Sequence, residues 1–163
     1  MLSRVMSRNY AIMPELDIAI QPGLTIITGE TGAGKSILLG ALGLALGRRA
    51  ETKVLPDDDS KCIVEAHFHL EEESLKSLFS AEGLDYDTLL ICRREISSSG
   101  RSRSFINDTP VSLKLLQEIT GHLIEIHHQH DNLALQSKDY QINVLDTING
   151  SKTQHKEYTV LYT

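Results

Sequence analysis

The stretch "GETGAGKS", from Gly29 to Ser36, has the residue types and the spacing of a site that binds phosphate groups. It fits the P-loop pattern of a glycine, any four residues, a second glycine, a lysine and a serine or threonine. Backbone N–H groups in such a loop, and the N-terminus of the helix after it, face an anion. Lys35 would place a positive charge on the β- and γ-phosphates, and Ser36 would offer its hydroxyl to Mg²⁺. The pattern predicts a site for a nucleoside triphosphate and Mg²⁺ formed by Gly29, Glu30, Thr31, Gly32, Ala33, Gly34, Lys35 and Ser36.

The segments on either side of this loop are those that a P-loop needs. The apolar run "LTIIT", residues 24–28, predicts a strand that is covered on both faces. Residues 34 to about 48 predict a helix whose glycines and alanines let it pack closely on a sheet. A purely structural glycine-rich turn is the alternative, and these two flanking elements favour the nucleotide site.

A second candidate residue lies about a hundred positions further on, in the stretch "LIEIHHQHDN", residues 123–132. We expect a strand edge here, followed by a loop in which Gln129 contacts Mg²⁺ and orients the attacking water without carrying a charge. Three histidines surround it, and no cysteine or pair of carboxylates accompanies them to complete a metal site. His127, His128 and His130 are therefore interpreted as forming local hydrogen bonds or as contacting the nucleotide.

The remaining elements follow from hydrophobic periodicity. Alternating apolar residues predict strands at 2–13, 15–23 and 61–70, and a hairpin from 88–96 and 102–108 around the turn "SSSG". Helical patterns cover 71–83, 110–123 and 132–148, with Pro110 as the first residue of the second of these helices.

Charged residues are distributed unevenly along the chain. The net charge of −6 over 163 residues argues against a nucleic-acid footprint over the whole surface. Arg93, Arg94, Arg101 and Arg103 nevertheless lie on one predicted hairpin, and alternation puts the first two on opposite faces and the last two on one face. These arginines either contact DNA phosphates or keep an exposed hairpin soluble, while the acidic run at 57–59 is interpreted as a solvated loop.

Two cysteines and the hydropathy pattern indicate the compartment. Cys62 and Cys92 lie in strand-like runs, which favours buried free thiols over a disulfide. The N-terminus has no uninterrupted apolar segment of the kind a signal peptide requires, and the longest apolar run is too short to span a bilayer. We expect a cytoplasmic location without a membrane partner.

Three stretches carry a resemblance to a known family. Residues 8–51 ("RNYAIMPELDIAIQPGLTIITGETGAGKSILLGALGLALGRRAE"), 96–119 ("ISSSGRSRSFINDTPVSLKLLQEI") and 123–136 ("LIEIHHQHDNLALQ") resemble the RecN family of bacterial DNA repair proteins. These are SMC-like members of the ABC ATPase superfamily. The family's histidine–glycine–glutamine–histidine pattern corresponds to His127–His130, with His128 in place of the small residue.

The resemblance implies an α/β P-loop NTPase fold of the ABC/SMC-like head type, with a mixed sheet around the Walker A helix. It implies ATP-driven double-strand break repair and recombination in the bacterial cytoplasm, in association with the nucleoid. Two heads would sandwich two ATP molecules, and DNA, a second copy and the head's own C-terminal lobe would be partners. The resemblance implies that Lys35 and Ser36 are Walker A residues and that Gln129 is the Q-loop glutamine. Arg8 and Asn9 would lie near the nucleotide, and Arg48 and Arg49 would either approach ATP or DNA or form a solvated helix end.

Two parts of an ABC-type site are not found in this sequence. No apolar run ends in Asp-Glu as a Walker B strand does, and no LSGG signature precedes a helix. In the resembled family both follow a coiled coil, so we expect residues 1–150 to form the N-terminal lobe of a split head and 151–163 to begin the coiled coil. The chain alone is then expected not to hydrolyse ATP and to expose apolar surface. A small P-loop phosphotransferase and a non-catalytic nucleotide-binding module are the alternatives.

Overall fold

The computed structural model describes residues 1–28, 34–50, 60–70, 75–126, 138–150 and 158. The chain divides into two compact units, Met1–Glu125 and Ile126–Thr163, which are considered separately. The first unit holds the sheet and most of the candidate residues. Gln129, its neighbouring histidines, Asp57–Asp59 and the first five residues of the phosphate-binding loop lie outside the described residues.

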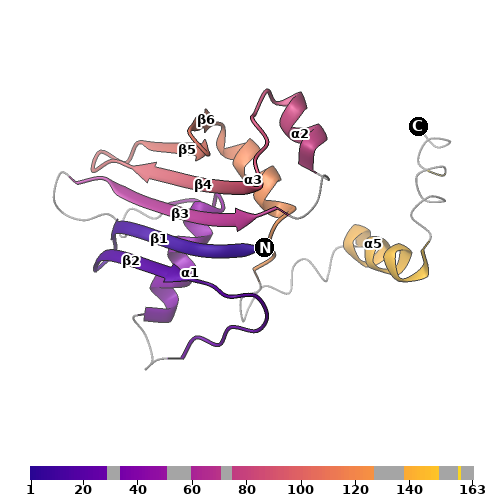
Figure 1. The fold of residues 1–163 in the computed structure, drawn as a ribbon, viewed down its shortest axis with the longest axis horizontal. Helices are drawn as coiled ribbons and strands as arrows, with labels where there is room; N and C mark the ends of the chain where they lie inside the picture. The colour runs from indigo at the N-terminus through magenta and orange to yellow at the C-terminus, as the bar shows by residue number, and fades with distance from the viewer. Residues whose placement is uncertain (29–33, 51–59, 71–74, 127–137, 151–157, 159–163) are drawn as a thin grey trace. The chain divides into compact units, whose positions relative to one another are not determined.

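The first unit is built on a six-stranded sheet with the order β2-β1-β3-β4-β5-β6 (Figure 1). The strands predicted at 2–13, 15–23 and 61–70 and the predicted hairpin are confirmed, and every pair of neighbouring strands in this sheet is antiparallel. The strands are β1 (Leu2–Tyr10), β2 (Met13–Ala19), β3 (Cys62–His69), β4 (Leu89–Ile96), β5 (Ser102–Ile106) and β6 (Thr109–Val111).

Two helices cover one face of this sheet. Helix α1 (Gly34–Ala45) packs against β1, β3 and β4, and α3 (Leu113–Gly121) packs against β5. Figure 1 shows both behind the strands, while the short α2 (Lys76–Ala81) precedes β4. We call the covered face the inner face and the opposite one the outer face.

The inner face supplies the core because alternate strand residues point toward the helices. In β3 the buried positions are Cys62, Val64, Ala66 and Phe68, and in α3 they include Leu116 and Ile119. Burying each large aliphatic or aromatic side chain contributes about 1.5–3 kcal/mol. The core is therefore mostly aliphatic, with Phe68 among its few aromatic members.

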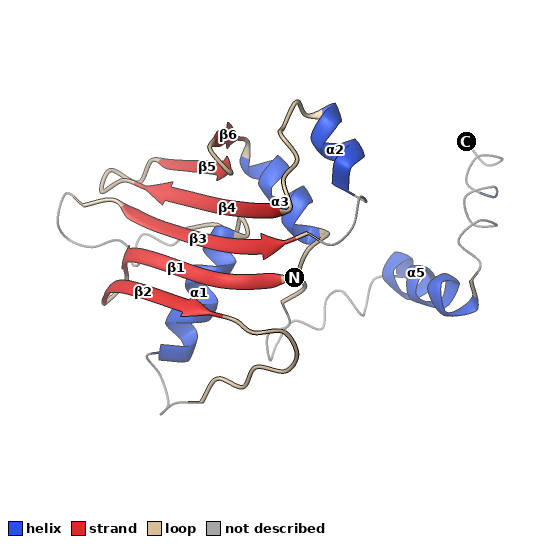
Figure 2. Cartoon of the chain, viewed as in Figure 1, coloured by secondary structure: helices blue, strands red, loops and turns tan. Residues whose placement is uncertain are grey.

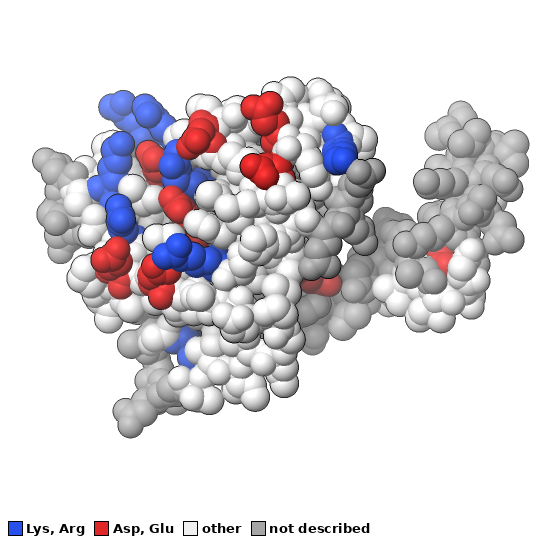
Figure 3. All heavy atoms as spheres, viewed as in Figure 1, with Lys and Arg blue, Asp and Glu red and all other residues white. Residues whose placement is uncertain are grey.

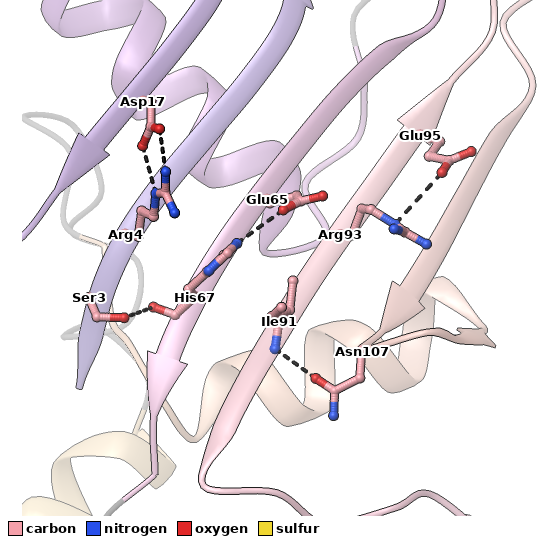
Figure 4. A network of polar contacts seen from close by, with 9 residues as sticks. All are labelled: Ser3, Arg4, Asp17, Glu65, His67, Ile91, Arg93, Glu95 and Asn107. Carbon is pink, nitrogen blue, oxygen red and sulfur yellow. Dashed lines mark hydrogen bonds and ion pairs between the residues drawn. The ribbon is translucent and has the colours of Figure 1, made fainter.

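The outer face carries pairs of charged and polar side chains, both within a strand and between neighbouring strands (Figure 4). Arg4 of β1 binds Asp17 of β2, and the His67 ring lies 3.0 Å from the Glu65 carboxylate within β3. Solvent and salt screen an exposed pair such as Arg4–Asp17, so it adds little to stability. These pairs make the outer face the more polar side of the sheet, although Ile63, Ile91 and Phe105 also lie on it.

Residues 24–28 correct one prediction. They form no strand and are drawn as loop in Figure 2, between the end of β2 and α1. Leu24, Ile26 and Ile27 are 89%, 74% and 48% exposed. Among the described residues no strand lies beside this segment, so its backbone has no ladder to join. Residues 123–126 likewise lack the strand expected of them.

The segment before α3 corrects a second prediction, that of a helix beginning at Pro110. Pro110 lies in β6 rather than in the first turn of the helix, which begins at Leu113 after the N-cap Ser112. The Ser112 hydroxyl accepts a hydrogen bond from the Leu115 N–H at 3.1 Å. A two-residue turn with Asn107 at φ 52° joins β5 to β6, and the Asn107 side chain accepts from the Ile91 N–H at 2.9 Å (Figure 4).

The second unit contains α5 (Lys138–Asn149), which lies within the helix predicted at 132–148 except for its last residue. Ile142, Leu145 and Ile148 recur at helical spacing and are exposed. The assignment of 1–150 to one lobe and of 151–163 to the start of a coiled coil stays a prediction. Among the described helices, none is both long and apolar enough to cross a membrane.

Candidate functional site

The described end of the phosphate-binding loop lies at the N-terminus of α1. Gly34, Lys35 and Ser36 form its first turn, and all three are exposed. The first N–H groups of a helix have no partner within the helix, and the helix dipole places partial positive charge at this end. This turn therefore combines N–H groups that the helix itself does not use, a lysine and a hydroxyl, which fit a nucleotide's phosphates and a magnesium ion.

Apolar packing fixes the direction of α1. Its buried residues are Leu38, Ala41, Leu42, Gly43, Leu44 and Ala45. The Tyr10 hydroxyl at the end of β1 approaches the backbone of Gly40 so closely that a Cβ at that position would overlap it. The small residues thus allow close contact between helix and sheet, as predicted, and they hold the first turn of α1 in place.

The other end of α1 closes in a Schellman motif. The Arg48 N–H binds the Gly43 carbonyl at 2.9 Å and the Gly47 N–H binds the Leu44 carbonyl at 3.1 Å. Gly47 has φ 95°, and a Cβ there would lie 2.6 Å from Cγ of Gln117. A glycine at the end of an apolar helix is the sequence signal for such a terminus.

The structure does not bring Arg8 and Asn9 into contact with the described end of the loop. Arg8 lies on the outer face, where its Nε is 3.6 Å from a carboxylate oxygen of Glu15. The Asn9 side chain donates to the Lys61 carbonyl at 3.1 Å, and its backbone has φ 52°. Their roles near a nucleotide stay predictions, as does that of Gln129. Arg48 and Arg49 lie just beyond the end of α1 and are exposed.

The basic hairpin keeps two of its four arginines as exposed cations. Arg101 and Arg103 are exposed and line one pocket on the outer face, together with Lys61, Glu95, Ser97 and Ser99. Figure 3 shows Lys and Arg side chains gathered at the end of the sheet where β4 turns into β5. Lys61 directly precedes β3, more than 30 positions before the other residues that line this pocket, so sequence spacing alone could not place it in this group.

Arg94 does not belong to the predicted patch of four arginines. It is 2% exposed and lies on the inner face, as its alternation with Arg93 requires. Its Nε donates to the Ser102 hydroxyl at 3.2 Å, and its Nη1 lies 3.5 Å from the Arg48 carbonyl. Burial lowers the pKa of this guanidinium, and no carboxylate among the described residues pairs with it. Arg94 therefore cannot contact DNA in this structure.

Arg93 lies on the outer face but is held by its neighbours. Its guanidinium stacks over Phe105 of β5, with 4.5 Å from Cζ to the ring centroid. Its Nε is 3.7 Å from a carboxylate oxygen of Glu95, and the pair is drawn in Figure 4. Its side chain is 26% exposed, so it contributes less to a contact surface than Arg101 or Arg103.

Comparison with known proteins identifies the family. The model of a family described as an AAA domain matches residues 7–159. The chain belongs to this family. Membership of the AAA domain family implies that the chain binds a nucleotide, in agreement with the glycine loop and the exposed turn after it.

Curated relatives of this AAA domain confirm the resemblance to the RecN family. The DNA repair protein RecN of Haemophilus influenzae is 41% identical over 150 residues, which is 90% of this chain and 27% of that protein. RecN of Bacillus subtilis is 35% identical over 94% of this chain and 27% of its own length. The chain thus spans about a quarter of the length of these relatives.

Solved structures confirm the fold class. The Smc head domain with an extended coiled coil from Pyrococcus furiosus, bound to the C-terminal domain of ScpA, matches with a TM-score of 0.69 at 18% identity. That match covers 99% of this AAA domain chain and 45% of the Smc chain. A chain from work on ATP-driven dimerisation and DNA-stimulated activation of SMC ATPases gives a TM-score of 0.61 at 19% identity, covering 98% of its length. The predicted ABC/SMC-like head architecture is therefore confirmed.

Proposed function

We propose that this chain is the ATP-binding part of an ATPase that acts in DNA double-strand break repair and recombination. The observation that carries the proposal is the exposed first turn of α1, where Lys35 and Ser36 share a helix N-terminus. The proposal is supported by the RecN relatives, which are DNA repair proteins by name, and by the SMC-like fold.

In this proposal the nucleotide's phosphates occupy the loop Gly29–Ser36 and the N-terminus of α1. Lys35 neutralises charge on the β- and γ-phosphates, and the Ser36 hydroxyl orients Mg²⁺ with Gln129. Bound Mg²⁺ supplies charge neutralisation at the phosphates. A second head and the head's own C-terminal lobe would complete the hydrolytic site in the bacterial cytoplasm, at the nucleoid.

The first test is the affinity of this chain for Mg·ATP. Lys35→Ala is expected to weaken binding at least roughly tenfold, because a charge-assisted contact to phosphate is worth about 1.5–3 kcal/mol. Lys114→Ala is the matched control, since Lys114 is an exposed lysine on α3, a different helix from the one that begins at Gly34. Equal affinities for wild type and Lys35→Ala would contradict the proposed site.

Steady-state hydrolysis of Mg·ATP separates the ATPase-part proposal from a small phosphotransferase. We expect no turnover above the Lys35→Ala level, because neither a Walker B strand nor a signature segment is found in the sequence. Turnover that Lys35→Ala abolishes would mean that a complete active site lies within these residues and would favour the phosphotransferase. Binding without any turnover, even with a complementing lobe, would favour a non-catalytic nucleotide-binding module.

For contact with DNA we propose Lys61, Arg101 and Arg103 on the outer face, with Arg93 at its margin. The three exposed cations lie around one pocket that also carries the hydroxyls of Ser97 and Ser99 and the carboxylate of Glu95, 3.6 Å from Lys61 Nζ. Hydroxyls and cations together are the usual partners of DNA phosphates. Arg101→Ala combined with Arg103→Ala should weaken duplex binding at low salt. The slope of the logarithm of the binding constant against the logarithm of salt concentration should fall by the amount expected for about two phosphate contacts.

The matched control for this experiment is Lys76→Ala combined with Lys114→Ala, which removes the same charge from exposed sites outside the hairpin. Equal losses in both double variants would indicate a net-charge effect rather than a surface. Unchanged binding in the arginine variant would leave solubility as the role of the hairpin charges.

A further inference from the structure

Three consecutive carbonyls after α1 each accept a hydrogen bond from a distant side chain. The Leu46 carbonyl accepts from the Thr120 hydroxyl at 3.0 Å, and the Gly47 carbonyl accepts from Gln117 Nε2 at 2.7 Å. The Arg48 carbonyl is approached by Arg94 Nη1 at 3.5 Å. Two of these donors belong to α3 and one to β4. We call Thr120, Gln117 and Arg94 the α1 clamp.

Thr120 is the most informative member of the clamp. It is 3% exposed and lies on the buried side of α3, beside Ile119. A buried hydroxyl is unfavourable unless it is hydrogen-bonded, and valine has the same shape without this cost. The Thr120 hydroxyl bonds the Leu46 carbonyl and also lies 3.3 Å from the Gln117 carbonyl of its own helix. A polar residue here therefore fixes one relative position of α1 and α3, which apolar packing alone would leave less defined.

Gln117 and Arg94 hold the same turn from two further directions. Gln117 packs its Cγ against Gly47, at a distance that leaves no room for a Cβ on that residue. Arg94 brings a positive charge to the C-terminal end of α1, where the helix dipole favours cations, and its guanidinium is also bonded to Ser102 of β5. The end of α1 is thus tied to α3, β4 and β5 by polar contacts.

The consequence for the site follows from the stiffness of a helix. Helix α1 has 12 residues and is about 18 Å long, so fixing its C-terminal end restrains the tilt and rotation of its first turn. Contacts to phosphate depend on the placement of N–H groups, lysine and hydroxyl to within about 0.5 Å. We infer that Thr120 and Gln117 are positioning residues of the nucleotide site, which set where Lys35 and Ser36 lie. This inference rests on the proposed function of the chain in binding ATP.

The test compares four variants of the full chain by two measurements each, the dissociation constant for Mg·ATP and the melting temperature without nucleotide. Thr120→Val and Gln117→Ala should each weaken Mg·ATP binding roughly three- to tenfold, the effect of losing about one hydrogen bond. Thr120→Ser keeps the hydroxyl and should bind within about twofold of wild type. Glu118→Ala is the control, since Glu118 is the exposed neighbour of Gln117 on the same helix.

The two measurements together separate positioning from simple stabilisation. A lower melting temperature with an unchanged dissociation constant in both Thr120→Val and Gln117→Ala would overturn the inference, because the clamp would then only support the fold. Gln117 lies at the surface, so its variant remains informative if Thr120→Val fails to fold. Weaker binding by Thr120→Val, restored in Thr120→Ser, would support the inference.

The Lys35→Ala variant distinguishes a failure of this inference from a failure of the proposed function. Binding that depends on Lys35 but not on Thr120 or Gln117 would refute the inference and leave the proposed function intact. Binding that depends on none of the three would contradict the proposed function, and with it the inference that rests on it.

Discussion

At the scale of single residues, the two cysteines show how the sheet controls reactivity. Cys62 and Cys92 are completely buried on the inner face and are free thiols, as the sequence predicts. Cys62 lies opposite Ile96 and Cys92 opposite Ala66, so the two are offset by four positions along neighbouring strands, or about 13 Å. A disulfide needs Cα atoms within about 7 Å, so none can form in this fold.

Both thiols are expected to be inert in the native chain. Burial raises the pKa of Cys62 to about 11 and that of Cys92 to about 12, so at pH 8 almost no thiolate is present. Titration with a chromogenic disulfide reagent at pH 8 should give no fast reaction in buffer and two reactive thiols in denaturant. Fast reaction of the native chain would show that the β3–β4 region opens readily.

The Arg4–Asp17 pair gives a prediction with a defined sign. The hydrogen bond from Arg4 lowers the pKa of Asp17 below its usual value. A carboxyl with a lowered pKa in the folded state stabilises the fold above its unfolded pKa of about 3.9, and this contribution is lost as the pH falls through the folded value. In Arg4→Gln the pKa of Asp17, followed by carboxyl NMR, should rise. Arg8→Gln, which removes the partner of Glu15 instead, should leave it unchanged.

At the scale of elements, alternation in the sequence predicts where strands lie better than it predicts which face of each strand is buried. The alternating runs at β1, β2, β3 and β4 are confirmed, because one side of each faces the core and the other water. The same rule puts Arg93 and Arg94 on opposite faces, but it does not say which face is covered, so the sequence alone cannot show that Arg94 is the buried one. The apolar run at 24–28 indicates an extended, buried segment and carries no information on which strands cover it.

The state of residues 24–28 can be measured by amide hydrogen exchange. No partner strand lies beside this segment in the described part of the chain, and its side chains are exposed. Its amides should exchange on the timescale of an unstructured segment, whereas those of β3, paired on both sides, should be protected. Protection at 24–28 similar to that of β3 would mean that the segment acquires a partner strand in solution.

The sequence predicts the position of some candidate-site residues and not of others. Lys35 and Ser36 belong to one short stretch whose spacing has a single geometry, so both fall in the first turn of α1 as expected. Thr120, Gln117 and Lys61 meet their partners only through the fold, across 74, 70 and more than 30 positions of sequence. Nothing in the local pattern distinguishes such residues from ordinary helix or strand residues. They are therefore found only in the folded structure.

At the scale of the whole molecule, exposed apolar side chains determine how the chain behaves in solution. Leu24, Ile26 and Ile27 lie in a segment whose backbone donors and acceptors have no described partner, which is the arrangement that allows a strand to pair with another chain. We expect the chain to self-associate through this segment as its concentration rises. Sedimentation velocity over a hundredfold range of concentration should show an increasing average mass.

The variants that test this association differ only in which side chain they remove. Ile26→Lys takes away an exposed apolar side chain and adds a charge, so it should shift the association to higher concentration. Thr25→Lys adds the same charge to the same segment and keeps all three apolar side chains, so it should shift the association less. A wild-type chain that stays monomeric over the whole range would contradict the prediction. Equal shifts in the two variants would mean that charge repulsion, rather than apolar burial in a strand-like contact, controls the association.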